Sequence, residues 1–161
     1  FGSWDQMLTA SGSDNCNTPR FKCVILDENP PFFFTAGVLD RETGLVWTRV
    51  AFSTRMSWQA AMDFCEGLGL FDRFGWRLPS IDELKTIVDA SPDHLPDGHP
   101  FYNIPTGLYD EYWSSTIKLD ATGHPSLRTH LWLLSPELAF EDVPSSQYSP
   151  WCVRGPGVAG G

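Results

Sequence analysis

Hydrophobic side chains recur at helical spacing in the middle of the chain. Trp58, Ala61 and Cys65 follow one another at steps of three and four residues, directly behind Ser57. A serine in this position can cap the first turn of a helix with its hydroxyl oxygen. The pattern therefore predicts an amphipathic helix over residues 57 to 68, with the cysteine on its buried side.

A second helix is predicted shortly after the first. Ser80 and Glu83 form the Ser-x-x-Glu pattern of a capping box, in which each side chain accepts a hydrogen bond from the other residue's backbone amide. Ile81, Leu84 and Ile87 then place apolar side chains along one face. We expect a short helix that buries this stripe.

Short apolar or alternating runs elsewhere predict strands and turns. Residues 32–39 and 45–47 flank Asp40-Arg-Glu-Thr-Gly44, which has the aspartate and glycine of a hairpin turn. Between 91 and 112 the pattern dissolves into proline, glycine, aspartate and histidine, a length that is typical of functional loops. Further strands are predicted at 21–26, 112–116, 130–134 and 151–154, with turns around 120–123 and 144–146.

Length and composition indicate one domain with mixed secondary structure. The chain has 161 residues, of which 14% are aromatic, and its 14 glycines and 13 prolines interrupt it often. Such a mixture suits short strands and ordered loops better than a helical bundle. We expect an α+β fold in three parts: an N-terminal arm over 1–31, a domain over 32–155 and a flexible tail over 156–161.

The charge excludes several classes of partner. With 20 acidic against 11 basic residues, the net charge is −9. Nucleic acids, heparin-like glycans and anionic bilayers need clustered lysine and arginine, and most of this surface would repel them. No apolar run reaches the roughly 18 residues that cross a bilayer. We therefore expect neither a nucleic-acid partner nor a membrane span.

Four cysteines, Cys16, Cys23, Cys65 and Cys152, allow three disulfide connectivities. None forms a Cys-x-x-Cys pair and no histidine has zinc-finger spacing, so disulfides are favoured over a metal site. Cys16 and Cys23 flank a turn-forming Asn-Thr-Pro segment and can close a local loop, which would leave Cys65 to join Cys152. Disulfides persist in oxidising compartments and indicate a secreted or cell-surface protein.

Five motifs follow one another along the central and C-terminal chain. They are Gly44-Leu-Val-Trp47, Trp58-x-x-Ala61-x-x-x-Cys65, Trp76-Arg-Leu-Pro-Ser-x-x-Glu-Leu84, Tyr112-Trp-Ser-Ser-Thr116 and Cys152-Val-Arg-Gly155. Over residues 37 to 155 this set resembles the bacterial DUF1566 domain, also known as the C-terminal domain of the Legionella collagen-like protein, which is similar to C-type lectin folds.

The resemblance implies a C-type-lectin-like α+β fold, in which two short helices pack on small antiparallel sheets with long ordered loops. It also implies that Cys65 pairs with Cys152 on a terminal strand. The loops after the second helix would then form the binding face.

The motifs of calcium-dependent lectins are missing. Those proteins typically use Glu-Pro-Asn and Trp-Asn-Asp motifs, and here Tyr112-Trp113 continues with two serines. Tryptophans are more often core anchors than a sugar-stacking row; those expected in the core are Trp47, Trp58, Trp76, Trp113 and Trp151. Loop acids without EF-hand spacing indicate a solvated surface; they are Asp93, Asp97, Asp110, Glu111 and Asp120. We expect no metal and no cofactor.

Catalytic signatures are missing too. The segment Arg77-Leu-Pro-Ser-x-x-Glu83 is also similar to part of the formylglycine-generating enzymes, but these use paired reactive cysteines, and only Cys152 lies in the corresponding C-terminal region. The sequence has neither a Gly-x-Ser-x-Gly elbow nor a His-Glu-x-x-His motif. We therefore expect a protein that is not an enzyme, in which Arg77 binds loop carbonyls or a carboxylate.

These observations predict an extracellular recognition or adhesion module that presents loops from a stiff scaffold to a glycan or protein. The candidate contacts within 91–111 and 118–129 are His94, His99, Tyr102, Tyr109 and His124. The alternative is a structural subunit of a surface appendage or multimer. It would self-assemble through the aromatic N-terminal arm, with Trp4 and Phe32–Phe34 as contacts, and through the glycine-rich tail.

Overall fold

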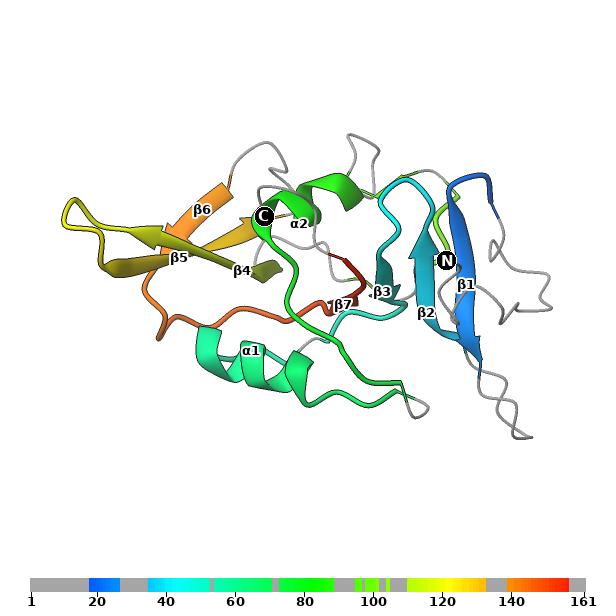
Figure 1. The fold of residues 1–161 in the computed structure, drawn as a ribbon, viewed down its shortest axis with the longest axis horizontal. Coiled ribbons are helices and arrows are strands. Elements are labelled where there is room, and N and C mark those ends of the chain that lie inside the picture. Colours follow the sequence, from blue (N-terminus) through cyan, green and yellow to red (C-terminus); the bar gives the residue numbers. More distant parts are fainter. Residues whose placement is uncertain are drawn as a thin grey trace.

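The computed structural model describes residues 18–26, 35–52, 54–70, 73–88, 95–96, 98–101, 104, 110–132 and 139–156. Within these ranges two helices pack with two antiparallel sheets (Figure 1). One sheet contains β1 (Phe21–Leu26), β2 (Thr35–Asp40), β3 (Val46–Thr48) and β7 (Val153–Arg154); the other contains β4 (Glu111–Leu119), β5 (Pro125–Trp132) and β6 (Ala139–Asp142). The helices are α1 (Trp58–Glu66) and α2 (Ile81–Ile87). The expected α+β fold is confirmed, and the arrangement is consistent with a C-type-lectin-like fold.

The four-stranded sheet joins the first described strand to the last. Its order is β1-β2-β3-β7, and all neighbours are antiparallel. The predicted hairpin between β2 and β3 is confirmed, because Gly44 donates its amide to the Asp40 carbonyl at 2.8 Å. Gly44 has a φ of 76°, a left-handed conformation that glycine adopts without the steric cost of a side chain.

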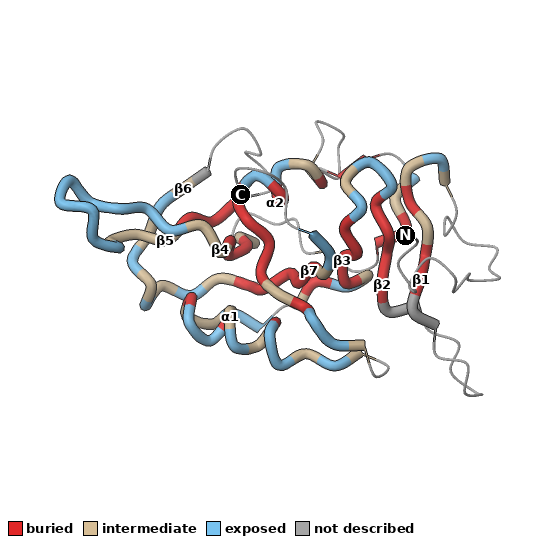
Figure 2. Tube along the Cα trace, viewed as in Figure 1, coloured by how far each residue is buried: buried red, intermediate tan, exposed pale blue. Residues whose placement is uncertain are grey.

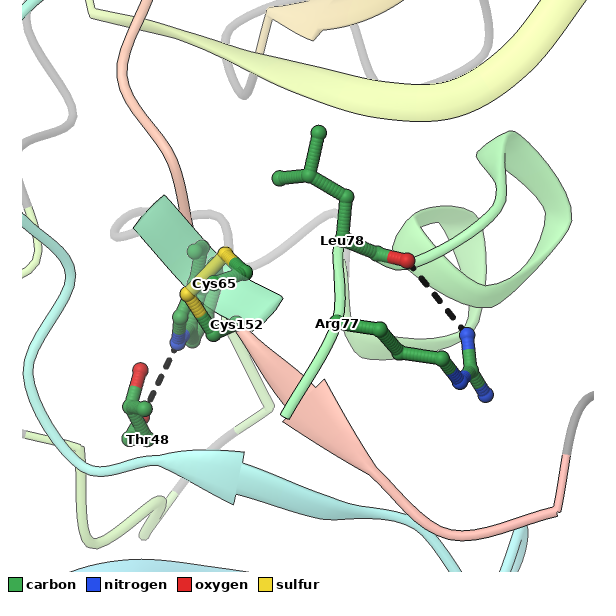
Figure 3. Close-up of a disulfide and its surroundings, with 6 residues drawn as sticks. Thr48, Cys65, Arg77, Leu78 and Cys152 are labelled. Carbon is green, nitrogen blue, oxygen red and sulfur yellow. Dashed lines mark hydrogen bonds between the residues drawn. A yellow bond between two sulfur atoms is a disulfide. The ribbon is translucent and has the colours of Figure 1, made fainter. Parts of the chain in front are cut away.

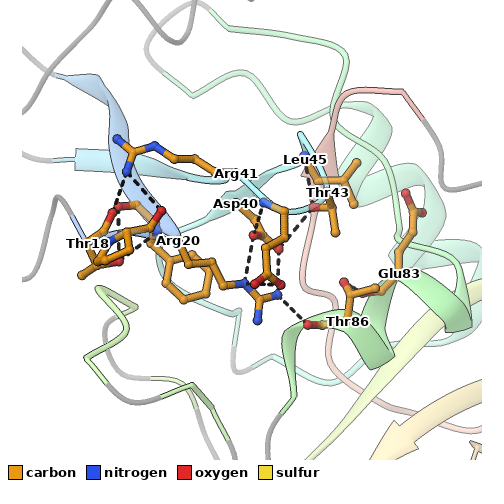
Figure 4. A network of polar contacts seen from close by, with 11 residues as sticks. Thr18, Arg20, Asp40, Arg41, Thr43, Leu45, Glu83 and Thr86 are labelled. Atoms are coloured by element: carbon orange, nitrogen blue, oxygen red, sulfur yellow. Dashed lines mark hydrogen bonds and ion pairs between the residues drawn. The ribbon is translucent and has the colours of Figure 1, made fainter.

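The segment that precedes residue 32 contributes a strand and an anchor to this sheet. β1 pairs with β2, and the guanidinium of Arg20 donates to both carboxylate oxygens of Asp40 at 2.9 Å (Figure 4). Arg20 also donates to the Thr86 carbonyl at 2.6 Å, which connects the sheet to α2. Cys23 is disulfide-bonded. The other residues predicted to act in the arm, Cys16, Trp4 and Phe32–Phe34, lie outside the described residues, so self-assembly through the arm stays a prediction.

Both helix caps form as the sequence predicts. The hydroxyl of Ser57 accepts a hydrogen bond from the Ala60 amide at 3.4 Å at the start of α1. At α2, the Ser80 hydroxyl accepts the Glu83 amide at 3.1 Å, and the Glu83 carboxylate accepts the Ser80 amide at 2.8 Å. Arg77 donates to the same carboxylate at 2.7 and 2.8 Å, which confirms its expected carboxylate partner. Glu83 therefore both caps α2 and binds the strand-like segment before it.

The three-stranded sheet is larger than predicted. The strand predicted at 112–116 lies within the nine residues of β4. The strand predicted at 130–134 overlaps the end of β5, which begins earlier, at Pro125, and ends at Trp132; residues 133 and 134 lie outside the described residues. An irregularity in the register between Trp113 and Ile117 interrupts the alternation of buried and exposed side chains along β4, so the sequence pattern predicted too short a strand. β6 was not predicted, because Ala-Phe-Glu-Asp has low strand propensity and forms a strand only through its pairing with β5.

The core is divided between the two faces of this sheet. Residues of α2 pack with Tyr112 and Trp151 on one side, and residues of α1 pack with Trp76 and Trp113 on the other. Figure 2 shows buried segments between the two helices and along β1, β2 and β3. All five tryptophans expected in the core are at most 8% exposed, which confirms that interpretation; they are Trp47, Trp58, Trp76, Trp113 and Trp151.

A buried disulfide closes the fold. Cys65 on α1 bonds to Cys152, next to β7, and both side chains are fully buried (Figure 3). The Cys152 carbonyl accepts the Thr48 amide at 3.0 Å, and Val153 exchanges two backbone hydrogen bonds with Arg77 at 2.8 and 2.9 Å. The pairing implied by the motifs is confirmed, and it ties α1 covalently to the last strand.

Candidate functional site

The far ends of β4 and β5 project beyond the rest of the molecule (Figure 1). The hairpin is exposed at this far end and buried at its base (Figure 2). Within the described residues five large apolar side chains are exposed, and three of them lie here. Ile117 and Leu119 on β4 are 41% and 55% exposed, and Val143, directly after β6, is 48% exposed. We call residues 117–128 together with Val143 the hairpin end. Exposed apolar side chains gathered on a projecting element are typical of a contact surface.

The turn of the hairpin end is held by its own polar contacts. The Asp120 carboxylate accepts hydrogen bonds from the Thr122 amide at 2.8 Å, the Thr122 hydroxyl at 2.6 Å and the His124 amide at 3.0 Å. These bonds, the Thr122 hydroxyl first among them, hold the pKa of Asp120 below its usual range. Gly123 completes the turn with a φ of 84°. The tip is therefore ordered before any ligand arrives.

The charges of the hairpin end are already engaged within the protein. Lys118 on β4 lies 2.8 Å from a carboxylate oxygen of Glu141 on β6. Arg128 on β5 places its guanidinium 4.5 Å from the ring centre of Trp58. The ring Nδ1 of His124 lies 2.7 Å from the Thr122 hydroxyl at the tip. The hairpin end consequently offers aliphatic side chains and one imidazole to a partner.

An aromatic and acidic cluster lies at the base of the hairpin. The His130 ring of β5 stacks on Tyr148 with ring centres 4.1 Å apart and on Phe140 of β6 at 5.8 Å. Its Nδ1 lies 2.5 Å from a carboxylate oxygen of Glu111 on β4, and Tyr148 donates its hydroxyl to Asp142 at 2.6 Å. We call these five residues the base cluster. They connect all three strands to the segment that leads towards β7.

Burial shifts the acid–base behaviour of the base cluster. Loss of water around the imidazole lowers the pKa of His130 to about 4, although the neighbouring Asp142 carboxylate opposes the shift. Burial raises the pKa of Glu111 above its usual range. Both shifts have the same main cause, which is the loss of water around a group that would carry a charge.

A match to a family model places the chain in a family. A family model described as the Lcl C-terminal domain matches residues 36–154, which span β2 to β7 and include both cysteines of the buried bond. The chain belongs to the Lcl C-terminal domain family. No curated protein matches the chain. β1 lies before the matched segment, whereas the hairpin end and the base cluster belong to the Lcl C-terminal domain.

The residues predicted to contact a ligand are not all brought together. His124 lies at the tip of the hairpin end. His99 lies instead beside Phe101, which packs against Phe21 of β1, and the neighbouring Pro100 carbonyl accepts a hydrogen bond from Arg49. β1 and the hairpin end lie on opposite sides of the molecule (Figure 1). The remaining three, His94, Tyr102 and Tyr109, lie outside the described residues. A ligand-binding role for these residues stays a prediction.

Sequence reasoning missed the base cluster of this Lcl C-terminal domain. Glu111 was grouped with the solvated loop acids, and here it begins β4 and faces His130 across the sheet. Alternation along β5 could have placed Arg128 and His130 on one face. Their partners, however, come from β4, β6 and the segment after it, and only the register of the strands brings them together.

Two classes of site are not found within the described ranges. No group of three or more histidine, cysteine, aspartate or glutamate side chains is arranged to hold a metal ion there. No helix among the described residues is long and apolar enough to cross a membrane.

Proposed function

We propose that this Lcl C-terminal domain is a non-catalytic extracellular recognition or adhesion module that contacts a glycan or protein with its hairpin end. The observation that carries the proposal is the ordered, projecting β4–β5 hairpin, which displays Ile117, Leu119 and His124 away from the core. A surface that is already ordered loses less conformational entropy on binding, so more of the contact energy appears as affinity.

The frame behind the hairpin end supports this role. The disulfide ties α1 to the residue before β7, and the two core clusters pack α2 with Tyr112 and α1 with Trp113 of the strand β4 that carries the hairpin. Binding residues are commonly displayed on loops and turns that a rigid scaffold positions. The whole domain would therefore resist a force that a bound ligand exerts on the tip.

The disulfide and the family support an extracellular or surface location. Disulfides form and persist outside the reducing cytosol, and Cys65 and Cys152 are paired in the core. The family is named for the C-terminal domain of a Legionella collagen-like surface protein. Its ligand is not transferred to this chain, because a shared fold does not imply a shared ligand.

The test compares two sets of exposed apolar substitutions. A ligand is first found with a glycan array and with immobilised proteins from the native cell surface, using the full chain. The double variant Ile117→Ser/Leu119→Ser is then compared with Phe74→Ser, which changes a 63% exposed ring between α1 and α2. Loss of two apolar contacts at an interface is expected to weaken binding by at least about 10-fold.

Phe74→Ser should leave the affinity within about 2-fold of the unchanged protein, since surface substitutions away from an interface have small effects. His124→Ala tests the polar contact at the tip in the same assay. Equal affinity of all three variants and the unchanged protein would refute a binding role for the hairpin end.

A further inference from the structure

We infer that the hairpin end takes up an extended segment of a protein partner as an additional strand along the outer edge of β4, the edge that faces away from β5. The inference rests on the proposed function for the place of the site. It goes further by assigning the partner to polypeptides and the contact to the backbone of Ile117 and Leu119. Its basis is the direction of the backbone groups along β4.

The base of this outer edge already pairs with other segments of the same chain. The Trp113 amide donates to the Ser149 carbonyl at 3.0 Å, and the Ser115 amide donates to the Pro79 carbonyl at 2.8 Å. Successive residues of a strand direct their backbone groups to opposite edges. The odd-numbered residues of β4 therefore serve the outer edge at its base, and the edge accepts peptide backbone there.

The same direction holds beyond the irregularity in β4. The Lys118 carbonyl accepts a hydrogen bond from the Ser126 hydroxyl of β5 at 3.2 Å. The Asp120 amide donates to the carbonyl of His124, directly before β5, at 2.8 Å. Residues 118 and 120 thus direct their backbone groups towards β5. Their odd-numbered neighbours in β4 consequently direct theirs outwards.

The outward backbone groups of Ile117 and Leu119 are not used within the described ranges. Neither residue makes a backbone hydrogen bond there to a segment outside β4 and β5. Leu119 lies opposite Pro125, whose nitrogen carries no hydrogen for a bond between the strands. The side chains of Ile117 and Leu119 are 41% and 55% exposed. The hairpin end therefore presents an unpaired strand edge flanked by two apolar side chains.

This edge fits a polypeptide better than a glycan. Outward-facing residues recur about every 6.8 Å along a strand, and each offers one donor and one acceptor. An extended peptide repeats the complementary groups at the same interval, which is how strands are added to exposed sheet edges. The hydroxyl groups of a glycan do not repeat as paired donors and acceptors along one line.

A second copy of the chain fits the edge poorly. Lys118 lies between the two outward-facing residues, so antiparallel pairing of two identical edges about it would bring two ammonium groups together. Lysines on edge strands commonly prevent such pairing, and the net charge of −9 opposes self-association. Lys118 already lies 2.8 Å from Glu141, so a partner residue beside it needs no charge. The segment that fits carries apolar side chains at every second position, with uncharged polar ones between them.

The experiment follows the exchange of single backbone amides in the full chain by nuclear magnetic resonance. The probe is a peptide of about seven residues with blocked ends, in which valine alternates with threonine. In the free protein the amides of Ile117 and Leu119 should exchange at nearly the intrinsic rate, whereas the Asp120 amide is protected by its bond to His124. Saturating peptide should slow the two outward amides by at least about 10-fold and leave Asp120 unchanged. A matched peptide with proline in place of the central threonine should protect neither amide.

Four results would overturn the inference. They are slow exchange of both outward amides in the free protein, no protection by the valine–threonine peptide, protection by a neutral hexasaccharide in its place, and protection that rises with protein concentration alone. The third result would assign the edge to a glycan, and the fourth would assign it to a second copy of the chain.

Two variants of Leu119 test the backbone contact with the same peptide. Leu119→Ala and Leu119→Pro both remove the apolar side chain, but only proline also removes the outward amide, a change that an edge strand tolerates. Leu119→Pro should bind the peptide at least about 5-fold more weakly than Leu119→Ala. Equal affinities of two folded variants would contradict strand addition, and the amide exchange of the unchanged protein decides if the proline variant does not fold.

The peptide assay is separate from the test of the proposed function. If strand addition fails while Ile117→Ser/Leu119→Ser still weakens recognition, the hairpin end remains a binding surface that acts through its side chains alone. If that double variant binds normally, the proposed function fails, whatever the peptide result.

Discussion

Replacing Cys65 and Cys152 by alanine removes a bond between positions 87 residues apart in the sequence. The bond stabilises the fold mainly by restricting the unfolded chain, and the entropy of closing a loop of this length corresponds to about 4–5 kcal/mol. Both side chains are fully buried, so the lost sulfur atoms also leave a small cavity that costs roughly 1 kcal/mol. The expected total is about 5 kcal/mol, a large part of the stability of an ordinary domain.

The loss is measured by urea unfolding, with tryptophan fluorescence as the signal. For a chain of this size a slope of about 2 kcal/mol per M urea is expected, so the midpoint should fall by about 2–3 M. Reduction of the unchanged protein would also break the bond of Cys23, so the alanine variants give the cleaner comparison.

The two single variants provide the control. Removing either cysteine breaks the same bond, so Cys65→Ala, Cys152→Ala and the double variant should be destabilised by nearly equal amounts, and the losses should not add. A midpoint that moves by less than about 0.5 M in the double variant would refute the account of the bond as the main long-range constraint.

Two further substitutions test the polar contacts that hold the fold. Glu83→Gln keeps a side chain that can cap α2 but removes the charge that faces Arg77. The expected loss of stability is about 2 kcal/mol, which corresponds to a decrease of about 4–8 °C in the thermal midpoint. An unchanged midpoint would show that the ion pair does not stabilise the fold. Arg20→Met leaves the fully buried Asp40 carboxylate without its cation and should cost about 3 kcal/mol in urea unfolding. Adding Asp40→Asn should recover part of that loss, whereas a further decrease would contradict the explanation.

Local signals predicted the helices and the first hairpin well. The capping hydrogen bonds of Ser57, Ser80 and Glu83 each join a side chain to a backbone amide three residues away, so both partners are visible in a short stretch of sequence. The turn from Asp40 to Gly44 is equally local. The Cys65–Cys152 bond is different, because its partners are far apart, and the resemblance to a family was needed to imply it directly.

The base cluster could not be predicted because it depends on strand register. Glu111 and His130 face each other only because β4 pairs with β5 in one alignment, and the irregularity after Trp113 changes that alignment along the hairpin. Phe140 reaches the cluster through β6, whose sequence does not resemble a strand. His124 and His99 illustrate the same limit, since His124 contacts Thr122 at the tip of the hairpin end whereas His99 lies beside Phe101, which packs against β1.

The covalent link has a mechanical consequence. A force that stretches the chain from its two sides meets the Cys65–Cys152 bond before it can extend the residues between them. With 87 residues of separation and about 3.4 Å per extended residue, about 300 Å of contour length stays inaccessible until the bond is reduced. The hairpin end lies inside this protected loop. Under a stretching force the four-stranded sheet would therefore unfold first, and the hairpin end would remain folded.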